Sequence, residues 1–152
     1  MKSNHFITVV LIAVLAACQS ATPLPTLTIT DSEEFTLAVD QYAVTSNLDI
    51  TIRFLGVAGD ERCPSELECA VSGPVSVLLS IQQGDAVATE MTLQSFTDSN
   101  GRAPEGPFEG IQDHVTVGDY LIRLKGVLPY PLKSFNEIKD AKYQVTLVVS
   151  RQ

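Results

Sequence analysis

The stretch Val75-Ser76-Val77-Leu78-Leu79-Ser80-Ile81 decides the fold, because its side chains alternate with a period of two. Successive side chains of a β-strand point to opposite faces, so the pattern predicts a strand that buries Val75, Val77, Leu79 and Ile81. Three more runs alternate in the same way, at residues 48–54, 120–125 and 143–150. Weaker strands are predicted at residues 27–30, 35–39, 42–45, 87–96 and 114–117.

Turn chemistry fits this strand count. Residues 83–85 and 98–101 are rich in turn formers, and the phase of the alternation slips at Asp40-Gln41, which indicates a bulge or tight turn. The only helical expectation is one short turn within residues 134–141. We therefore expect an all-β fold of seven to nine strands in two packed antiparallel sheets, a β-sandwich that is immunoglobulin-like in the broad sense. A small closed β-barrel is the alternative.

The N-terminal segment has the order of a secretory signal. Lys2 precedes an apolar run, and Leu15-Ala16-Ala17-Cys18 closes it. This segment resembles those of bacterial lipoprotein precursors, and the resemblance implies cleavage before Cys18 and acylation of Cys18 by chains such as palmitate. More than one acyl chain makes membrane anchoring stable. The alternative is an ordinary cleaved signal in which Cys18 is incidental.

The signal divides the chain into three parts. Residues 1–17 form the expected signal peptide, residues 18–26 a lipidated tether containing Pro23 and Pro25, and residues 27–152 one β-sandwich domain. We expect the protein in the bacterial cell envelope, held to the membrane by lipid. Gln19, rather than Asp, follows Cys18, and the resemblance then favours the outer membrane in a host with two membranes.

The charge balance limits the partners. The chain has 18 acidic and 10 basic residues, for a formal net charge of −8 at pH 7. Both nucleic acid and anionic headgroups would repel such a chain, so nucleic acid is not expected as a partner.

Cys63 and Cys69 form an even pair once Cys18 is assigned to lipid, and in an exported chain such a pair predicts a disulfide. The alternative is metal or redox handling, with the two thiolates and His114 as ligands. The five-residue gap between the cysteines does not match zinc knuckles, and the Cys-x-x-Cys spacing of redox dithiols is absent. We therefore predict no metal site and no cofactor.

The same region carries a second resemblance. Arg62-Cys63-Pro64, then Cys69 and Gly73, and later Pro129-Tyr130-Pro131, resemble a group of small bacterial lipoproteins and secreted proteins. The resemblance covers residues 34–150 and implies a β domain with one disulfide, without an activity. That group commonly has a tryptophan where this chain has Val71.

Two loops stand out. Asp60, Glu61, Glu66 and Glu68 surround the cysteines, and we interpret them as a solvated acidic loop rather than a calcium site, because their spacing matches no calcium motif. Residues 97–112 form a long loop that Phe108 and Ile111 could attach to the core; such loops are often functional or disordered.

Catalysis has little support in the sequence. No Gly-x-Ser-x-Gly elbow, phosphate loop or dinucleotide motif is present, so we predict no enzyme. Tyr130, stiffened by a proline on each side, is a possible binding surface, with packing over the end of the sandwich as the alternative. The predicted function is a lipid-anchored, non-catalytic binding or structural module whose partner is an envelope protein, a peptide or a glycan.

Overall fold

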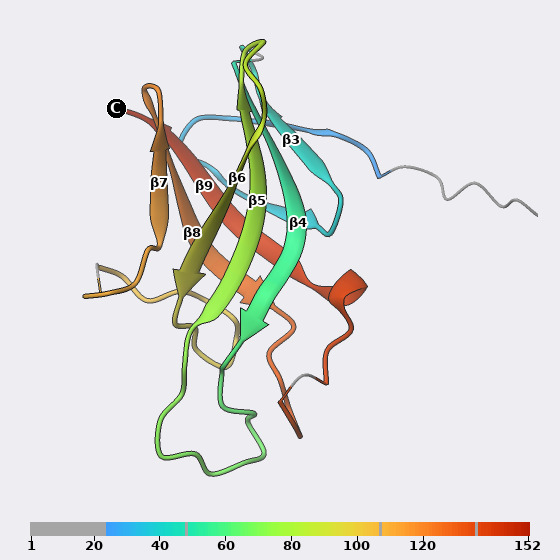
Figure 1. The fold of residues 1–152 in the computed structure, drawn as a ribbon, viewed down its shortest axis with the longest axis vertical. Helices are drawn as coiled ribbons and strands as arrows, with labels where there is room; N and C mark the ends of the chain where they lie inside the picture. Colours follow the sequence, from blue (N-terminus) through green and yellow to red (C-terminus); the bar gives the residue numbers. More distant parts are fainter. Residues whose placement is uncertain (1–23, 48, 107, 136) are drawn as a thin grey trace, which may run out of the picture.

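A computed structural model describes residues 24–47, 49–106, 108–135 and 137–152. Over these residues the chain forms two facing sheets, a β-sandwich (Figure 1). One sheet has the order β1-β3-β4-β5-β6 and the other has the order β2-β9-β8-β7. The strands are β1 Leu27–Ile29, β2 Glu34–Ala38, β3 Tyr42–Thr45, β4 Ile50–Asp60, β5 Val75–Gln83, β6 Thr89–Ser95, β7 His114–Val117, β8 Tyr120–Leu128 and β9 Gln144–Arg151.

The four strongly alternating runs became the long strands β4, β5, β8 and β9, and the five weaker runs became the short ones. Leu48, the predicted start of one run, lies outside the described residues. In β5 the buried residues are Val75, Val77, Leu79 and Ile81, as the alternation predicts. The sheets do not close on each other, so the barrel alternative is wrong.

The core lies between the two sheets. Its fully buried side chains come from alternate positions of facing strands: Ile52 and Phe54 in β4, and Ile122 and Leu147 in β8 and β9. A two-sheet core needs only one apolar face from each strand, and this explains why apolar and polar residues alternate clearly in the sequence.

The phase slip at Asp40-Gln41 is a tight turn that carries the chain from one sheet to the other. Asp40 has a φ of 67°, its backbone N–H donates to the carbonyl of Phe54 at 2.7 Å, and Gln41 donates to the carbonyl of Ala38 at 3.0 Å. One pairing departs from the antiparallel prediction, because β1 runs parallel to β3.

The remaining local predictions have clear outcomes. Gly84 and Gly101 have φ values of 51° and 75° in the two predicted turns. The short helical turn is a 3-10 segment, Asp140–Lys142, at the end of the predicted range. Within the described ranges, no helix is long and apolar enough to cross a membrane.

Candidate functional site: the loop end of the sandwich

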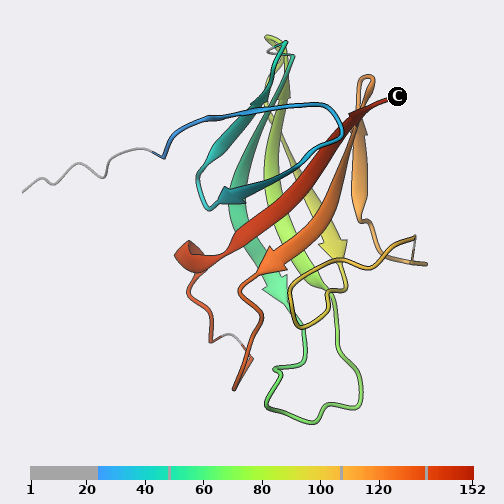
Figure 2. The ribbon, with the colours of Figure 1, turned by 180° about the vertical axis from the view of Figure 1, so that it is seen from behind.

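The candidate site is the end of the sandwich formed by residues 61–74, between β4 and β5, and residues 129–142, between β8 and β9. We call these two segments together the loop end. Figures 1 and 2 both place it at the lower end of the long axis, with the 61–74 segment in green projecting furthest, whereas the blue segment that contains β1 crosses the upper half of the sandwich. Two separate chain segments therefore supply one surface.

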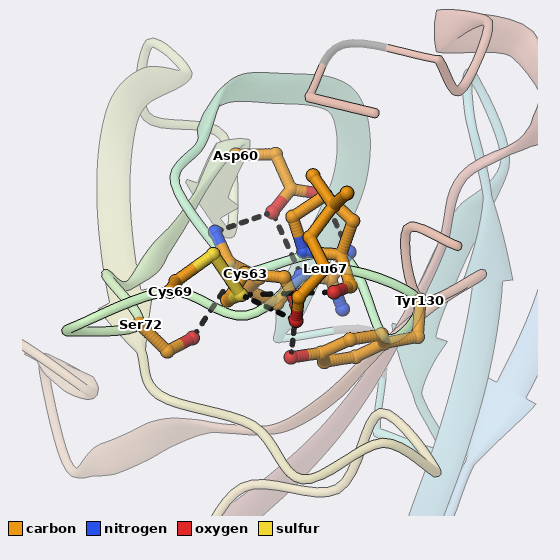
Figure 3. Close-up of a disulfide and its surroundings, with 8 residues drawn as sticks. Asp60, Cys63, Leu67, Cys69, Ser72 and Tyr130 are labelled. Atoms are coloured by element: carbon orange, nitrogen blue, oxygen red, sulfur yellow. Dashed lines mark hydrogen bonds and ion pairs between the residues drawn. A yellow bond between two sulfur atoms is a disulfide. The ribbon is translucent and has the colours of Figure 1, made fainter. Parts of the chain in front are cut away.

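Cys63 and Cys69 are joined by a disulfide with an S–S distance of 2.04 Å, as predicted. Figure 3 shows the bond lying across the 61–74 loop. The backbone N–H of Cys63 donates to Ser72 Oγ at 3.0 Å, so the two sides of the loop are also linked by a hydrogen bond. The disulfide shapes a loop that would otherwise connect two strands without regular structure.

Asp60 and Arg62 form a buried ion pair at the root of this loop. The side chain of Arg62 is 0% exposed and that of Asp60 is 5% exposed. Arg62 Nε donates to Asp60 Oδ1 at 2.7 Å, and Arg62 Nη2 donates to Asp60 Oδ2 at 2.6 Å. This two-point geometry is the strong form of an arginine–carboxylate contact.

The rest of the guanidinium is also satisfied. Nη1 donates to the carbonyl of Val127 at 2.9 Å and to Thr97 Oγ1 at 3.3 Å, and Nη2 donates to the carbonyl of Pro129 at 2.9 Å. A guanidinium has five N–H groups, and here each has an acceptor. Burying a charge is costly unless it is paired and hydrogen-bonded, so this complete set makes the buried Arg62 tolerable. Arg62 thereby attaches the 61–74 loop to the end of β8.

Tyr143, the residue immediately before β9, extends the network. Its hydroxyl donates to Asp60 Oδ2 at 3.0 Å. Burial, followed by the negative charge of Asp60 and this hydrogen bond, raises the pKa of Tyr143 far above its ordinary value. The phenol therefore stays protonated and serves as a donor to the carboxylate.

Tyr130 lies inside the loop end and connects its two segments. Its hydroxyl donates to the carbonyl of Cys63 at 2.9 Å (Figure 3). The guanidinium carbon of Arg62 lies 4.9 Å from the centroid of the Tyr130 ring, a cation–π contact. The predicted binding residue is therefore half-buried, and its hydroxyl and one ring face are engaged in contacts within the loop end.

Backbone contacts complete the junction. Ser65 and Glu66 donate through their N–H groups to the carbonyls of Pro131 and Leu132, at 3.0 and 2.8 Å. At Gly73 the backbone passes so close to Glu61 that an added Cβ would lie 2.5 Å from Glu61 Cβ and 2.9 Å from its carbonyl oxygen. Only glycine fits this approach.

The interpretation of the acidic loop was wrong for Asp60. Glu61, Glu66 and Glu68 are exposed, as expected of a solvated loop, but the Asp60 side chain is buried against Arg62. Sequence reasoning also missed Arg62 and Tyr143 as members of a network. Their partners at residues 97, 127 and 129 are distant in sequence, and the only local signal was Arg62 beside the first cysteine.

The residues of the metal alternative do not meet as ligands. The two sulfurs are bonded to each other. His114, the first residue of β7, has its Nδ1 2.6 Å from Oδ1 of Asp113, the residue before the strand. Among the described residues, no three His, Cys, Asp or Glu side chains are grouped so that they could hold a metal ion.

In the 97–112 loop, the ring of Phe108 packs edge-on against Phe96, with centroids 5.6 Å apart. Phe96 lies outside the core and Phe108 is 43% exposed, so this contact holds the loop to the surface beside the end of β6 and not to the core. The turn at its start is closed by Asp98, whose side chain accepts the N–H groups of Asn100 and Arg102, each at 2.9 Å. These bonds, that from Arg102 first, lower the pKa of Asp98. Cys18, the predicted lipidation site, lies outside the described residues.

Fold and site define a β-sandwich protein with a disulfide-closed loop fixed by a buried ion pair. Comparison of the chain with protein-family models, with curated proteins and with solved structures finds no match. Functional inference therefore depends on the residues themselves.

Proposed function

We propose that the protein is a lipid-anchored, non-catalytic binding module of the bacterial cell envelope that presents its loop end to a partner. The observation that carries the proposal is the sequence Leu15-Ala16-Ala17-Cys18 at the end of an apolar run. Acyl chains on Cys18 would hold the protein at a membrane surface. No protein segment is then needed for the membrane contact.

The arrangement of the described chain supports a free loop end. The blue segment at the start of the described residues leaves the side of the sandwich in its upper half, whereas the loop end forms the lower end of the long axis (Figures 1 and 2). A protein held through its N-terminal segment would thus be attached away from the loop end. The loop end could then meet an envelope protein, a peptide or a glycan.

The use of polar groups supports binding rather than catalysis. Arg62 and Tyr130 of the loop end, and Asp60 at the end of β4, are each engaged in the internal contacts described above. Such contacts fix the shape of a surface in advance, which lowers the entropic cost of binding. They also leave these groups without a free proton acceptor or nucleophile to offer.

The test is metabolic labelling with an alkyne fatty acid, followed by membrane fractionation, in a bacterium that expresses the full chain. The wild-type protein should carry label and sediment with membranes, whereas Cys18→Ser should lose both properties. Cys63→Ser combined with Cys69→Ser is the matched control and should keep the label. Label on Cys18→Ser, or an unlabelled wild-type protein, would overturn the lipid assignment.

A further inference from the structure

The lysines and arginines of this acidic protein are not distributed evenly with respect to ion pairs. Six of the nine described lysines and arginines lie within 4.0 Å of a carboxylate oxygen. Across the described part of the chain, the three without such a pair are Lys133, Lys139 and Lys142. All three are exposed and belong to one segment of the loop end. In a chain with a net charge of −8, this is the place where cations remain available.

Two of these lysines border a groove of about 290 Å³. Four apolar or aromatic residues line it, namely Pro129, Tyr130, Leu132 and Ile138, and its polar border consists of Lys133, Lys142 and Glu137. Lys139 does not line the groove. The volume is close to the lower end of ligand pockets, about 300 Å³, so the groove suits a few side chains rather than a large ligand.

The one carboxylate on the border is engaged within the loop. Glu137 accepts hydrogen bonds from the backbone N–H groups of Leu132 and Lys133. These bonds, that from Leu132 first, hold the pKa of Glu137 below its ordinary value, so it is a fixed anion that shapes the loop. Glu137 therefore reduces the positive charge of the border without pairing with either lysine.

The groove is preformed. Tyr130 is held by its hydroxyl bond to Cys63 and by the guanidinium of Arg62, while the N–H of Glu66 fixes the carbonyl of Leu132. Leu132 nevertheless leaves 52% of its surface exposed. An apolar side chain held open in this way can gain contact area on binding without a large ordering cost.

The chemistry of the lining selects the ligand class. Glycan sites need several free hydrogen-bonding side chains, and the described lining offers only lysines and an engaged carboxylate. Apolar walls together with two ammonium groups that pair with no carboxylate instead complement an apolar side chain next to carboxylates. We propose that this groove binds an acidic peptide segment in which apolar side chains alternate with aspartate or glutamate. The inference rests on the proposed binding function and specifies its partner.

The probe is a short peptide in which leucine and phenylalanine alternate with glutamate, carrying a neutral dye. Its binding to the purified full chain in detergent is followed by fluorescence anisotropy. A companion peptide with glutamine in place of glutamate should bind at least about fivefold more weakly, the size of effect that exposed charges have. A soluble oligogalacturonate serves as the glycan competitor and should not displace the peptide.

Two matched pairs of variants locate the site. Lys142→Glu should weaken binding about fivefold, whereas Lys139→Glu, the same change outside the groove, should have little effect. Leu132→Ser should weaken binding about tenfold through lost apolar contact. Val87→Ser is its control, because Val87 is 90% exposed in the β5–β6 connection. Both apolar positions are exposed, so neither change threatens folding.

Equal effects of Lys139→Glu and Lys142→Glu would overturn the proposal, as would absence of peptide binding. Displacement by oligogalacturonate, or its binding in place of the peptide, would overturn the peptide in favour of a glycan. These outcomes are independent of lipidation. Peptide binding by a protein that carries no lipid would leave the groove in place and remove only the anchor.

Discussion

Replacing Arg62 with alanine should cost about 4 kcal/mol of the free energy of unfolding. The change leaves the Asp60 carboxylate buried without its partner, and breaking a buried pair in this way costs about 3–5 kcal/mol. It also removes the donors to the carbonyls of Val127 and Pro129, each at 2.9 Å. Since small domains unfold with only about 5–15 kcal/mol, a loss of this size is a large share of the total.

The assay is urea unfolding of the purified full chain, followed by circular dichroism because the chain has no tryptophan. Arg102→Ala is the matched control: its ion pair with Glu34 is long, 3.4 Å, and exposed on both sides. The control should lose less than about 1 kcal/mol. If Arg62→Ala also lost less than about 1 kcal/mol, the buried pair would not support the loop end and the reasoning would be wrong.

A double variant separates the two contributions. Asp60→Leu combined with Arg62→Met replaces the charges by apolar groups of similar length, and such replacements are often close to neutral. We expect it to be more stable than Arg62→Ala alone. Its remaining deficit should reflect the carbonyls and the Tyr143 hydroxyl that lose their partners. A double variant less stable than the single one would refute the charge-burial argument.

Three further predictions concern the same end of the sandwich. Folding raises the pKa of Tyr143, so the free energy of unfolding that this group contributes should be fully present below pH 10 and should decrease above it. Between pH 8 and 11, urea unfolding should show the wild type losing about 1.4 kcal/mol more than Tyr143→Phe. Cys63→Ser with Cys69→Ser should lose about 2 kcal/mol by the same assay yet keep its far-ultraviolet spectrum, and an unchanged stability would contradict a structural disulfide. Gly73→Ala should lose about 1–3 kcal/mol of the free energy of unfolding, because the added Cβ has no room beside Glu61. Gly59→Ala is the control, since an added Cβ there meets nothing within 4 Å, and equal losses for the two variants would contradict the close approach at Gly73.

The sequence was informative wherever a local pattern determines the structure. The alternation at 75–81 identified a strand and its buried face, and the slip at Asp40-Gln41 located the turn between sheets. The disulfide also followed from the two cysteines that remain once the lipoprotein resemblance assigns Cys18 to lipid. In the strand and the turn, the residues that determine the structure are close in sequence. In the disulfide, they are cysteines, which have few possible partners.

The buried network could not be predicted, because its members are separated by the topology of the sandwich. Asp60 and Arg62 appear in the sequence as part of a charged loop, and nothing near them reports that the end of β8 covers Arg62. The parallel pairing of β1 with β3 has the same origin, since strand direction depends on where the chain re-enters the sheet. Contacts and pairings of this kind can be predicted only when the fold is already known.

The edge strand β1 has a mechanical consequence for a protein attached through its N-terminal segment. It pairs with β3 over three residues only, and one further bond, from Gln41 Nε2 to the carbonyl of Pro25 at 3.0 Å, holds the preceding chain. Tension on that segment loads this short pairing first, while β2 stays paired with β9 over five positions. Release of residues 24–30 would add up to about 20 Å of reach, at the cost of exposing Ile29, about 2 kcal/mol. The bonds from the N–H groups of Ser32 and Arg151 to the Val149 carbonyl and the Asp31 carboxylate, at 2.7 and 2.8 Å, would still hold the chain to β9. In a protein held through this segment, the attachment can therefore lengthen under load before the loop end loses its shape.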